Sequence, residues 1–229
     1  MLEKLKEEVF KANLDLVSHG LVILTFGNAS AIDRSSNLVV IKPSGVPYAT
    51  MKPDDMVVID MNGVVVEGFL NPSTDAPSHV AIYKSLGAVG GIVHTHSTYA
   101  TAWAQAGMAI PCLGTTHADH FHGSVPVTRS LTLAETENDY EYNTGLVIAE
   151  AAGSSDPLAV PAVLVRSHGP FTWGETASGA VINAVVLEEV ARMAAITASL
   201  APVKEIDRVL LDKHFLRKHG KSSYYGQNK

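Results

Sequence analysis

Apolar residues at the start of the chain recur at alternating intervals of three and four. The positions are Leu2, Leu5, Val9, Ala12 and Leu16. This spacing puts them on one face of a helix, so it predicts an amphipathic α-helix that ends at His19-Gly20. A second helical pattern, rich in Ala, Val, Leu and Glu, predicts the longest helix over residues 176–200.

Short apolar runs between these two helices predict a β-sheet. Strands are expected over residues 21–25, 38–41, 56–60, 64–66, 91–96 and 162–165, and helices over 77–86 and 99–105. Asn62-Gly63 separates two of the strands and predicts a type I′ hairpin. An early hairpin favours a mostly antiparallel or mixed central sheet flanked by helices, which is an α/β sandwich. Without repeats or a long linker, residues 1–229 are expected to form one domain.

Three of the ten histidines lie at the ends of apolar strand-like runs. His94 and His96 end one strand two positions apart, and alternate side chains of a strand point to the same face. His168 follows another apolar run, and Asp75 in a polar loop can add a carboxylate. Three imidazoles and one carboxylate suit Zn²⁺, and Mn²⁺ or Co²⁺ can enter similar sites. The simpler alternative is that each histidine is only a hydrogen-bonded structural residue.

A second histidine cluster offers another candidate metal site. It comprises His117, His120 and His122. Asp119 lies inside this cluster, but a catalytic role competes for that carboxylate. The strand-end histidines are therefore the preferred metal site.

Three short loops are rich in hydrogen-bond donors. They cover residues 27–30, 41–45 and 72–74, and the last precedes a predicted helix. Hydroxyls, backbone amides, a helix N-terminus and one lysine can together form a phosphate cradle. The chain contains neither the G-x-x-x-x-G-K nor the G-x-G-x-x-G pattern, which excludes the P-loop and the dinucleotide-binding fingerprint. Each loop alone is more simply a turn, whereas a shared sugar-phosphate site explains all three.

The composition limits the partners of the chain. Hydrophobic residues make up 46 % and charged residues only 17 %, so we expect part of the surface to be covered by another subunit. A formal net charge of −6 does not favour nucleic acid or an anionic membrane as a partner. We therefore expect an anionic substrate to be held by a local cluster of donors.

Cysteine usage and the N-terminal segment suggest a cellular compartment. Cys112 is the only cysteine, which excludes an internal disulfide and a thiolate zinc cluster. The first eight residues are too charged for a secretory signal, and no apolar run approaches the roughly 18–20 residues of a membrane span. The sequence therefore predicts a protein of the reducing cytoplasm.

Characteristic strings extend from the first strands to the end of the chain. They are LTFGN (24–28), IKPSGV (41–46), GIVHTHS (91–97), GTTHAD (114–119), SHGPF (167–171), LDKH (211–214), RKHG (217–220) and YYGQ (224–227). In these strings the chain resembles the class II aldolase/epimerase family, and most closely its L-ribulose-5-phosphate 4-epimerase branch. His120 and His122 depart from the aromatic residues common in that branch.

The resemblance implies roles for individual residues. The implied metal ligands are Asp75, His94, His96 and His168. The implied contacts to the substrate and its phosphate are Gly27, Asn28, Lys42, Ser44, Gly45, Ser73, Thr74, Thr116 and His214. The implied acid/base pair is Asp119 and Tyr225, with the tyrosine supplied by a neighbouring subunit of a C4 homotetramer. Residues 213–229 would form a C-terminal tail that docks on that neighbour.

The implied reaction converts L-ribulose 5-phosphate to D-xylulose 5-phosphate by inversion at C4, a step of both arabinose and ascorbate/xylulose routes. The C–H bond at C4 is not adjacent to the carbonyl and is not acidic, so retro-aldol cleavage of C3–C4 followed by re-formation is the favoured route. One alternative is a class II aldolase that cleaves a deoxy-ketohexose 1-phosphate. Others are an amidohydrolase, which also uses H-x-H, and a metal-stabilised binding protein.

Overall fold

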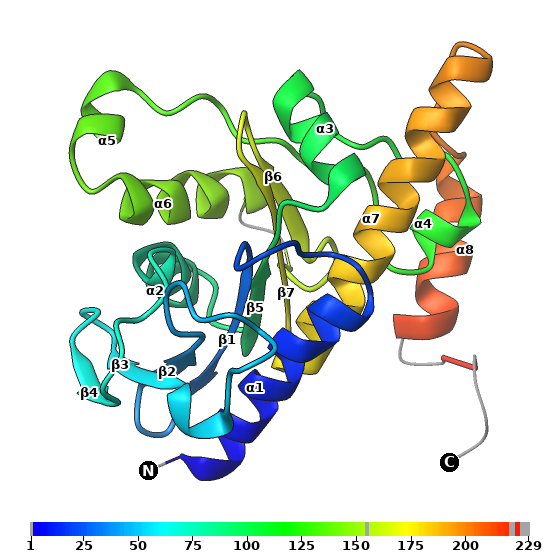
Figure 1. The fold of residues 1–229 in the computed structure, drawn as a ribbon. Coiled ribbons are helices and arrows are strands. Elements are labelled where there is room, and N and C mark those ends of the chain that lie inside the picture. The colour runs from blue at the N-terminus through cyan, green and yellow to red at the C-terminus, as the bar shows by residue number, and fades with distance from the viewer. Residues whose placement is uncertain (1, 154–155, 220–222, 225–229) are drawn as a thin grey trace.

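The computed structural model describes residues 2–153, 156–219 and 223–224. The strands are β1 (Asn28–Asp33), β2 (Leu38–Ile41), β3 (Val57–Asp60), β4 (Val65–Glu67), β5 (Gly91–His94), β6 (Ala162–Val165) and β7 (Gly169–Gly174). The helices are α1 (Glu3–Ser18), α2 (Ala76–Ser85), α3 (Thr98–Ala106), α4 (Thr115–Ala118), α5 (Leu133–Glu137), α6 (Tyr140–Ala152), α7 (Ala177–Leu200) and α8 (Arg208–His219), with a 3₁₀ turn η1 (Pro53–Asp55). Figure 1 shows the helices on both sides of the strands.

The seven strands form one sheet in the order β4-β3-β2-β1-β5-β7-β6. Every pair of neighbouring strands is antiparallel. Asn28 pairs with His94, and His94 pairs on its other side with Phe171. The start of β1, the end of β5 and the start of β7 therefore lie side by side at the same end of these three interior strands. The predicted α/β sandwich with an antiparallel sheet is confirmed.

Both faces of the sheet are buried. Val39 and Ile41 of β2 pack in a core with α2 and α6, whereas Val40 packs on the opposite face with α1 and α7. Alternate residues of a strand point to opposite faces, so a strand covered on both sides is apolar throughout. This explains the uninterrupted apolar run of β2.

The longest helix, α7, packs very closely against the sheet. A Cβ atom added to Gly91 would lie 2.3 Å from the backbone nitrogen of Ala177, and one added to Gly174 would lie 2.9 Å from that of Ala180. The helix buries mainly small alanines on this face. Glycine is required at both strand positions because the helix backbone occupies the space of a side chain.

The predicted strand at residues 21–25 is absent. Leu24 has a φ of 53°, and its side chain is 78 % exposed. The amide of Phe26 donates to the carbonyl of Ile23, so the segment turns instead of pairing with the sheet. The first strand begins at Asn28, three residues later than the predicted strand ends, and Asn28 therefore lies in β1 and not in a loop.

The hairpin predicted around Asn62-Gly63 is confirmed, but the predicted type I′ turn is wrong. A type I′ turn requires positive φ at both central residues, and only Gly63 has it, at 80°. Asp60 Oδ1 instead accepts hydrogen bonds from the amides of Asn62 and Val64. The side chain of Asp60 thus closes the turn.

The end of the chain differs from the simple tail that the sequence suggests. Residues 213–219 belong to α8, which packs on α4 of the same chain. Tyr225 and the residues after it lie outside the described part, so tail docking stays a proposal. Within the described ranges, no helix has both the length and the apolar character that a membrane crossing needs.

Candidate metal centre and phosphate cradle

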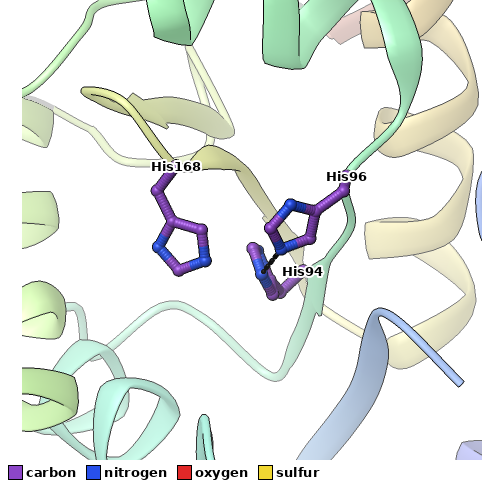
Figure 2. Close-up of side chains that lie close together, drawn as sticks. All are labelled: His94, His96 and His168. Atoms are coloured by element: carbon purple, nitrogen blue, oxygen red, sulfur yellow. Dashed lines mark hydrogen bonds between the residues drawn. The ribbon is translucent and has the colours of Figure 1, made fainter.

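Three histidines converge at the end of the sheet where β5 ends and β7 begins. His94 is the last residue of β5, His96 follows it by two positions, and His168 lies in the turn between β6 and β7. One nitrogen from each ring falls within a group whose members are all within 4.8 Å of one another. Figure 2 shows the three rings gathered around a shared space. The structure therefore brings together the three histidines predicted from the sequence.

The protein fixes the orientation of the His94 ring. Its Nδ1 donates to the carbonyl of Pro170 at 3.0 Å, and the ring stacks on Phe171 with centroids 4.2 Å apart. Burial lowers the pKa of His94 to about 3, although the Asp75 carboxylate opposes this shift. The imidazole is therefore neutral, and its lone pair is on Nε2.

The other two histidines complete a donor set that suits a metal ion. Nε2 of His96 lies 3.1 Å from Nε2 of His94, close to the roughly 3.4 Å between two nitrogens bound at 2.0–2.1 Å to one tetrahedral Zn²⁺. Nδ1 of His168 is buried without a hydrogen-bond partner among the described residues. Burial lowers the pKa of both His96 and His168, so both favour the neutral form that binds metal.

Asp75 lines the same cavity but lies outside the three-histidine group. It precedes α2, and its Oδ2 accepts a 2.7 Å hydrogen bond from Nδ2 of Asn28. Burial opposes ionisation of this carboxyl group, but His94, His79 and Asn28 together lower its pKa, so it is a carboxylate at neutral pH. Its role as the fourth metal ligand stays a prediction.

The predicted phosphate cradle forms part of the same cavity, which has a volume of about 430 Å³. The cradle residues that line it are Gly27, Asn28, Lys42, Ser44, Gly45, Ser73 and Thr74. Two of the three loops are joined by backbone hydrogen bonds, from Ser44 to Asn71 and from Ser73 to Lys42. The histidines and the donor-rich loops thus face one ligand-sized space.

Lys42 is a buried cation in this cavity. Its side chain is among the most buried large side chains, and its Nζ donates to the carbonyl of Pro43 at 3.3 Å. The Nζ also lies 4.8 Å from the centre of the Tyr48 ring. Among the described residues no carboxylate forms an ion pair with Lys42, and burial lowers its pKa. An anion bound beside it would supply the missing counter-charge.

Gly27 has no room for a side chain. It has a φ of 81°, and an added Cβ would lie 2.7 Å from Val22 Cγ1 and 2.9 Å from the carbonyl oxygen of His94. This close approach places the cradle loop directly against the end of β5, which carries His94. A substitution here therefore disturbs both halves of the cavity.

We expect Gly27→Ala to lower the free energy of unfolding by about 2–4 kcal/mol, because positive φ and a steric clash both act against alanine. The matched control is Gly45→Ala, since Gly45 has a φ of 67° but nothing within 4 Å of the added Cβ. That variant should lose only about 1 kcal/mol. Urea unfolding followed by circular dichroism measures both, and equal losses would show that the clash at Gly27 is relieved at little cost.

Two of the residues that line the cavity come from a segment in which the sequence indicated no site. Tyr140 and Glu141 form the first turn of α6. Ser78 of α2 donates its hydroxyl hydrogen to the Glu141 carbonyl at 2.5 Å and fixes this turn beside the cavity. Nothing in the polar segment around them signals a site, because only the packing of α6 on α2 brings them there.

The predicted acid/base residue Asp119 lies elsewhere in its own chain. It follows α4, and its carboxylate binds Nδ1 of His214 at 3.0 Å and Nη2 of Arg217 at 2.7 Å, with Lys218 Nζ at 3.4 Å. Burial opposes ionisation, but the hydrogen bonds from Arg217 and His214 lower the pKa of Asp119. Asp119 and His214 thus contact each other, and neither lines the histidine cavity.

Thr116 also lies away from the three histidines. It lines a separate cavity of about 260 Å³ between α4 and α7. Tyr225, the second member of the predicted acid/base pair, is outside the described residues. The residues predicted to hold the metal and the phosphate therefore line one cavity, whereas Asp119 does not line it within its own chain.

The second histidine cluster does not form a metal-binding group in the described part of the chain. Nε2 of His117 bonds the carbonyl of Gly123 at 2.8 Å, and Nε2 of His122 bonds Oδ1 of Asp212 at 2.6 Å. The ring of His120 instead faces that of His219. Each histidine has a separate partner, so the hypothesis of a second metal site is wrong for these residues.

Comparison with known proteins identifies the protein family of this chain. Residues 7–195 match the family described as Class II Aldolase and Adducin N-terminal domain. This range covers most of the chain and includes every strand and all three histidines of the cavity. The chain belongs to this class II aldolase family, a metal-dependent family.

Proteins of similar sequence point to one branch of this family. The chain is 59 % identical over 227 residues to proteins of Salmonella paratyphi B and Salmonella typhi, each named L-ribulose-5-phosphate 4-epimerase UlaF. The alignments cover 99 % of this chain and 100 % of each relative. This similarity extends to the C-terminal segment that follows the family match.

Solved structures support the fold. An L-fuculose 1-phosphate aldolase superimposes with a TM-score of 0.80 at 26 % identity, covering 92 % of this chain and 94 % of the other. The L-fuculose 1-phosphate aldolase from Glaciozyma antarctica PI12 gives a TM-score of 0.75 at 21 % identity, with 93 % and 80 % covered. The second of these shows similarity of fold alone.

Proposed function

We propose that this chain is an L-ribulose-5-phosphate 4-epimerase, which interconverts L-ribulose 5-phosphate and D-xylulose 5-phosphate. The observation that carries the proposal is the single cavity that holds three imidazoles beside a cradle with a buried lysine. Such a cavity suits a substrate with oxygen ligands at one end and a phosphate at the other. The full-length similarity to proteins named as this epimerase supports the same substrate.

Zn²⁺ is the proposed metal, with Mn²⁺ or Co²⁺ as substitutes, because three imidazoles form a typical catalytic zinc set. His94, His96 and His168 would hold it, with Asp75 as the proposed fourth ligand. When bound, the metal supplies a Lewis acid that stabilises negative charge on substrate oxygens. The chain orients the ligands through the hydrogen bond from His94 to Pro170 and the ring of Phe171.

The proposed reaction breaks and re-forms the C3–C4 bond. A base removes the proton of the C4 hydroxyl, C4 becomes an aldehyde carbon, and the bonding electrons pass to C3. The fragments are the enediolate of dihydroxyacetone and glycolaldehyde phosphate. The cradle around Lys42, Ser44 and Thr74 retains the phosphate end while the aldehyde turns, and bond formation on the opposite face inverts C4. The new C4 alkoxide then takes a proton from an acid on that face.

Asp119 and Tyr225 are the proposed acid/base pair. Because Asp119 does not line the histidine cavity of its own chain, we propose that subunits of a homotetramer bring the pair to that cavity. The C-terminal tail beyond α8 would carry Tyr225 to a neighbour, and Thr116 and His214 would reach the substrate from the same interface. A cytoplasmic location fits a phosphorylated sugar substrate.

Turnover with and without metal tests this function. Purified protein should convert L-ribulose 5-phosphate to D-xylulose 5-phosphate, lose this activity after dialysis against a chelator, and regain it with Zn²⁺, Mn²⁺ or Co²⁺. Metal analysis of the same samples gives the occupancy. Full turnover by metal-free protein would rule out the proposed mechanism.

A class II aldolase is the second candidate, favoured by the superposition on an L-fuculose 1-phosphate aldolase. The same assay separates the two activities. An epimerase retains glycolaldehyde phosphate between cleavage and re-formation, whereas an aldolase releases its fragments. Free glycolaldehyde phosphate in amounts comparable to D-xylulose 5-phosphate would favour the aldolase.

A further inference from the structure

Tyr48 contacts two loops of the phosphate cradle from behind the cavity. It is only 7 % exposed and does not line the cavity itself. Its hydroxyl lies 3.0 Å from the carbonyl oxygen of Phe26 and 2.9 Å from that of Gly27. The face of its ring lies 4.8 Å below the Nζ of Lys42. One side chain therefore joins the first cradle loop to the cation of the second.

The hydroxyl determines how the first loop is turned. A trans peptide holds its carbonyl and amide groups in opposite directions, so carbonyls aimed at Tyr48 turn the amides of Gly27 and Asn28 away from it. Within the described chain the Gly27 amide donates no hydrogen bond. Gly27 lines the cavity with a φ of 81°, one of several conformations open to glycine, so a contact is needed to support this one. The Tyr48 hydroxyl supplies that support.

The ring determines where the ammonium of Lys42 lies. A cation over an aromatic face is attracted by the negative π surface without being neutralised. Burial raises the pKa of Tyr48, so the phenol stays neutral and adds no counter-charge. The ring thus holds Lys42 in place but leaves its positive charge available to an anion.

We propose that Tyr48 is a positioning residue of the phosphate subsite. Its hydroxyl orients residues 26–28, and its ring holds the ammonium group of Lys42 in place. This inference rests on the proposed function, because it assigns the phosphate end of the substrate to this part of the cavity. It gives Tyr48 no contact with the reacting carbons. Its loss should therefore weaken phosphate binding and leave the chemical step nearly unchanged.

Three variants test the inference. Tyr48→Phe removes the hydroxyl and keeps the ring, whereas Tyr48→Leu removes both. The control is Thr172→Val, since Thr172 is 1 % exposed and its hydroxyl donates to the carbonyl of Ala180 at 3.0 Å, away from the cradle. This control also loses one buried hydrogen bond to a backbone carbonyl. Each metal-loaded variant is titrated with inorganic phosphate by calorimetry, and KM, kcat and bound metal are measured.

Tyr48→Phe should weaken inorganic phosphate binding about tenfold, the upper range for one hydrogen bond, and raise KM by a similar factor. Tyr48→Leu should weaken it about a hundredfold, since the cation–π contact is lost as well. In both, kcat and bound metal should stay close to the wild-type values, and Thr172→Val should bind phosphate normally. Normal phosphate binding by folded Tyr48→Phe, or an equal loss in Thr172→Val, would overturn the inference.

Epimerase turnover by the wild-type protein, compared with phosphate binding by the Tyr48 variants, separates this inference from the proposed function. Phosphate binding that depends on Tyr48, in a protein without epimerase turnover, would support the subsite and refute the epimerase. Normal epimerase turnover with phosphate binding that is independent of Tyr48 would refute the subsite role alone.

Discussion

Replacement of His96 by alanine is expected to remove the bound metal and to lower turnover of L-ribulose 5-phosphate by about a thousandfold, since a Lewis acid contributes several kcal/mol to transition-state stabilisation. Stability should change little, because the His96 side chain lies at the exposed side of the cavity, whereas His94 is buried. Metal analysis and steady-state kinetics measure the two effects. Thermal unfolding of the metal-free forms checks that the fold is intact.

His122→Ala is the matched control for the His96 variant. His122 belongs to the other histidine cluster and bonds Asp212, so its loss should leave one metal ion per chain. A drop in metal content in His122→Ala would show that the second histidine cluster also binds metal. Undiminished metal binding by His96→Ala would contradict the assignment of His96 as a ligand.

If the chain forms the proposed homotetramer, mixed assemblies of His96→Ala and Asp119→Asn are expected to recover activity that neither variant has alone. If each active site takes its histidines from one subunit and Asp119 from a neighbour, about a quarter of the sites in an equal mixture have both native groups in a closed ring. The mixture should therefore reach about a quarter of wild-type turnover. This effect is large because each variant alone should be nearly inactive.

The mixing experiment needs evidence of exchange between subunits. Differently tagged variants, dissociated and reassembled together, can be isolated by tandem affinity purification before the assay. A mixture of His96→Ala with His94→Ala is the negative control, because both changes fall in the same cavity and no site becomes complete. Isolated hybrids of the first pair without turnover would mean that Asp119 acts in its own chain or takes no part in catalysis.

The convergence of the three histidines could be predicted from the sequence because the signal was local. An H-x-H at the end of a strand places His94 and His96 on one face whatever the topology, and His168 followed another apolar strand. The strand β7 was missed, since all six of its residues are buried and its glycines and proline are typical of a loop. Its pairing with β5 is what brings His168 to the other two rings.

Contacts between distant elements explain what could not be predicted. Tyr140 and Glu141 reach the cavity only because α6 packs on α2, and no short-range pattern encodes that packing. The apolar run at 21–25 predicted a strand, but Leu24 adopts positive φ and exposes its side chain. The Asp119 prediction came from family resemblance, and within one chain this carboxylate is bound by Arg217.

The burial of Lys42 sets fold stability against ligand affinity. Among the described residues, its ammonium contacts the Pro43 carbonyl and the face of the Tyr48 ring and forms no ion pair. It is therefore less well solvated than in water, which destabilises the ligand-free chain. An apolar side chain of similar length would relieve the penalty and also remove the anion site. Selection for thermal robustness alone would therefore tend to replace this lysine, so its presence indicates a residue retained for binding at the expense of a more stable native state.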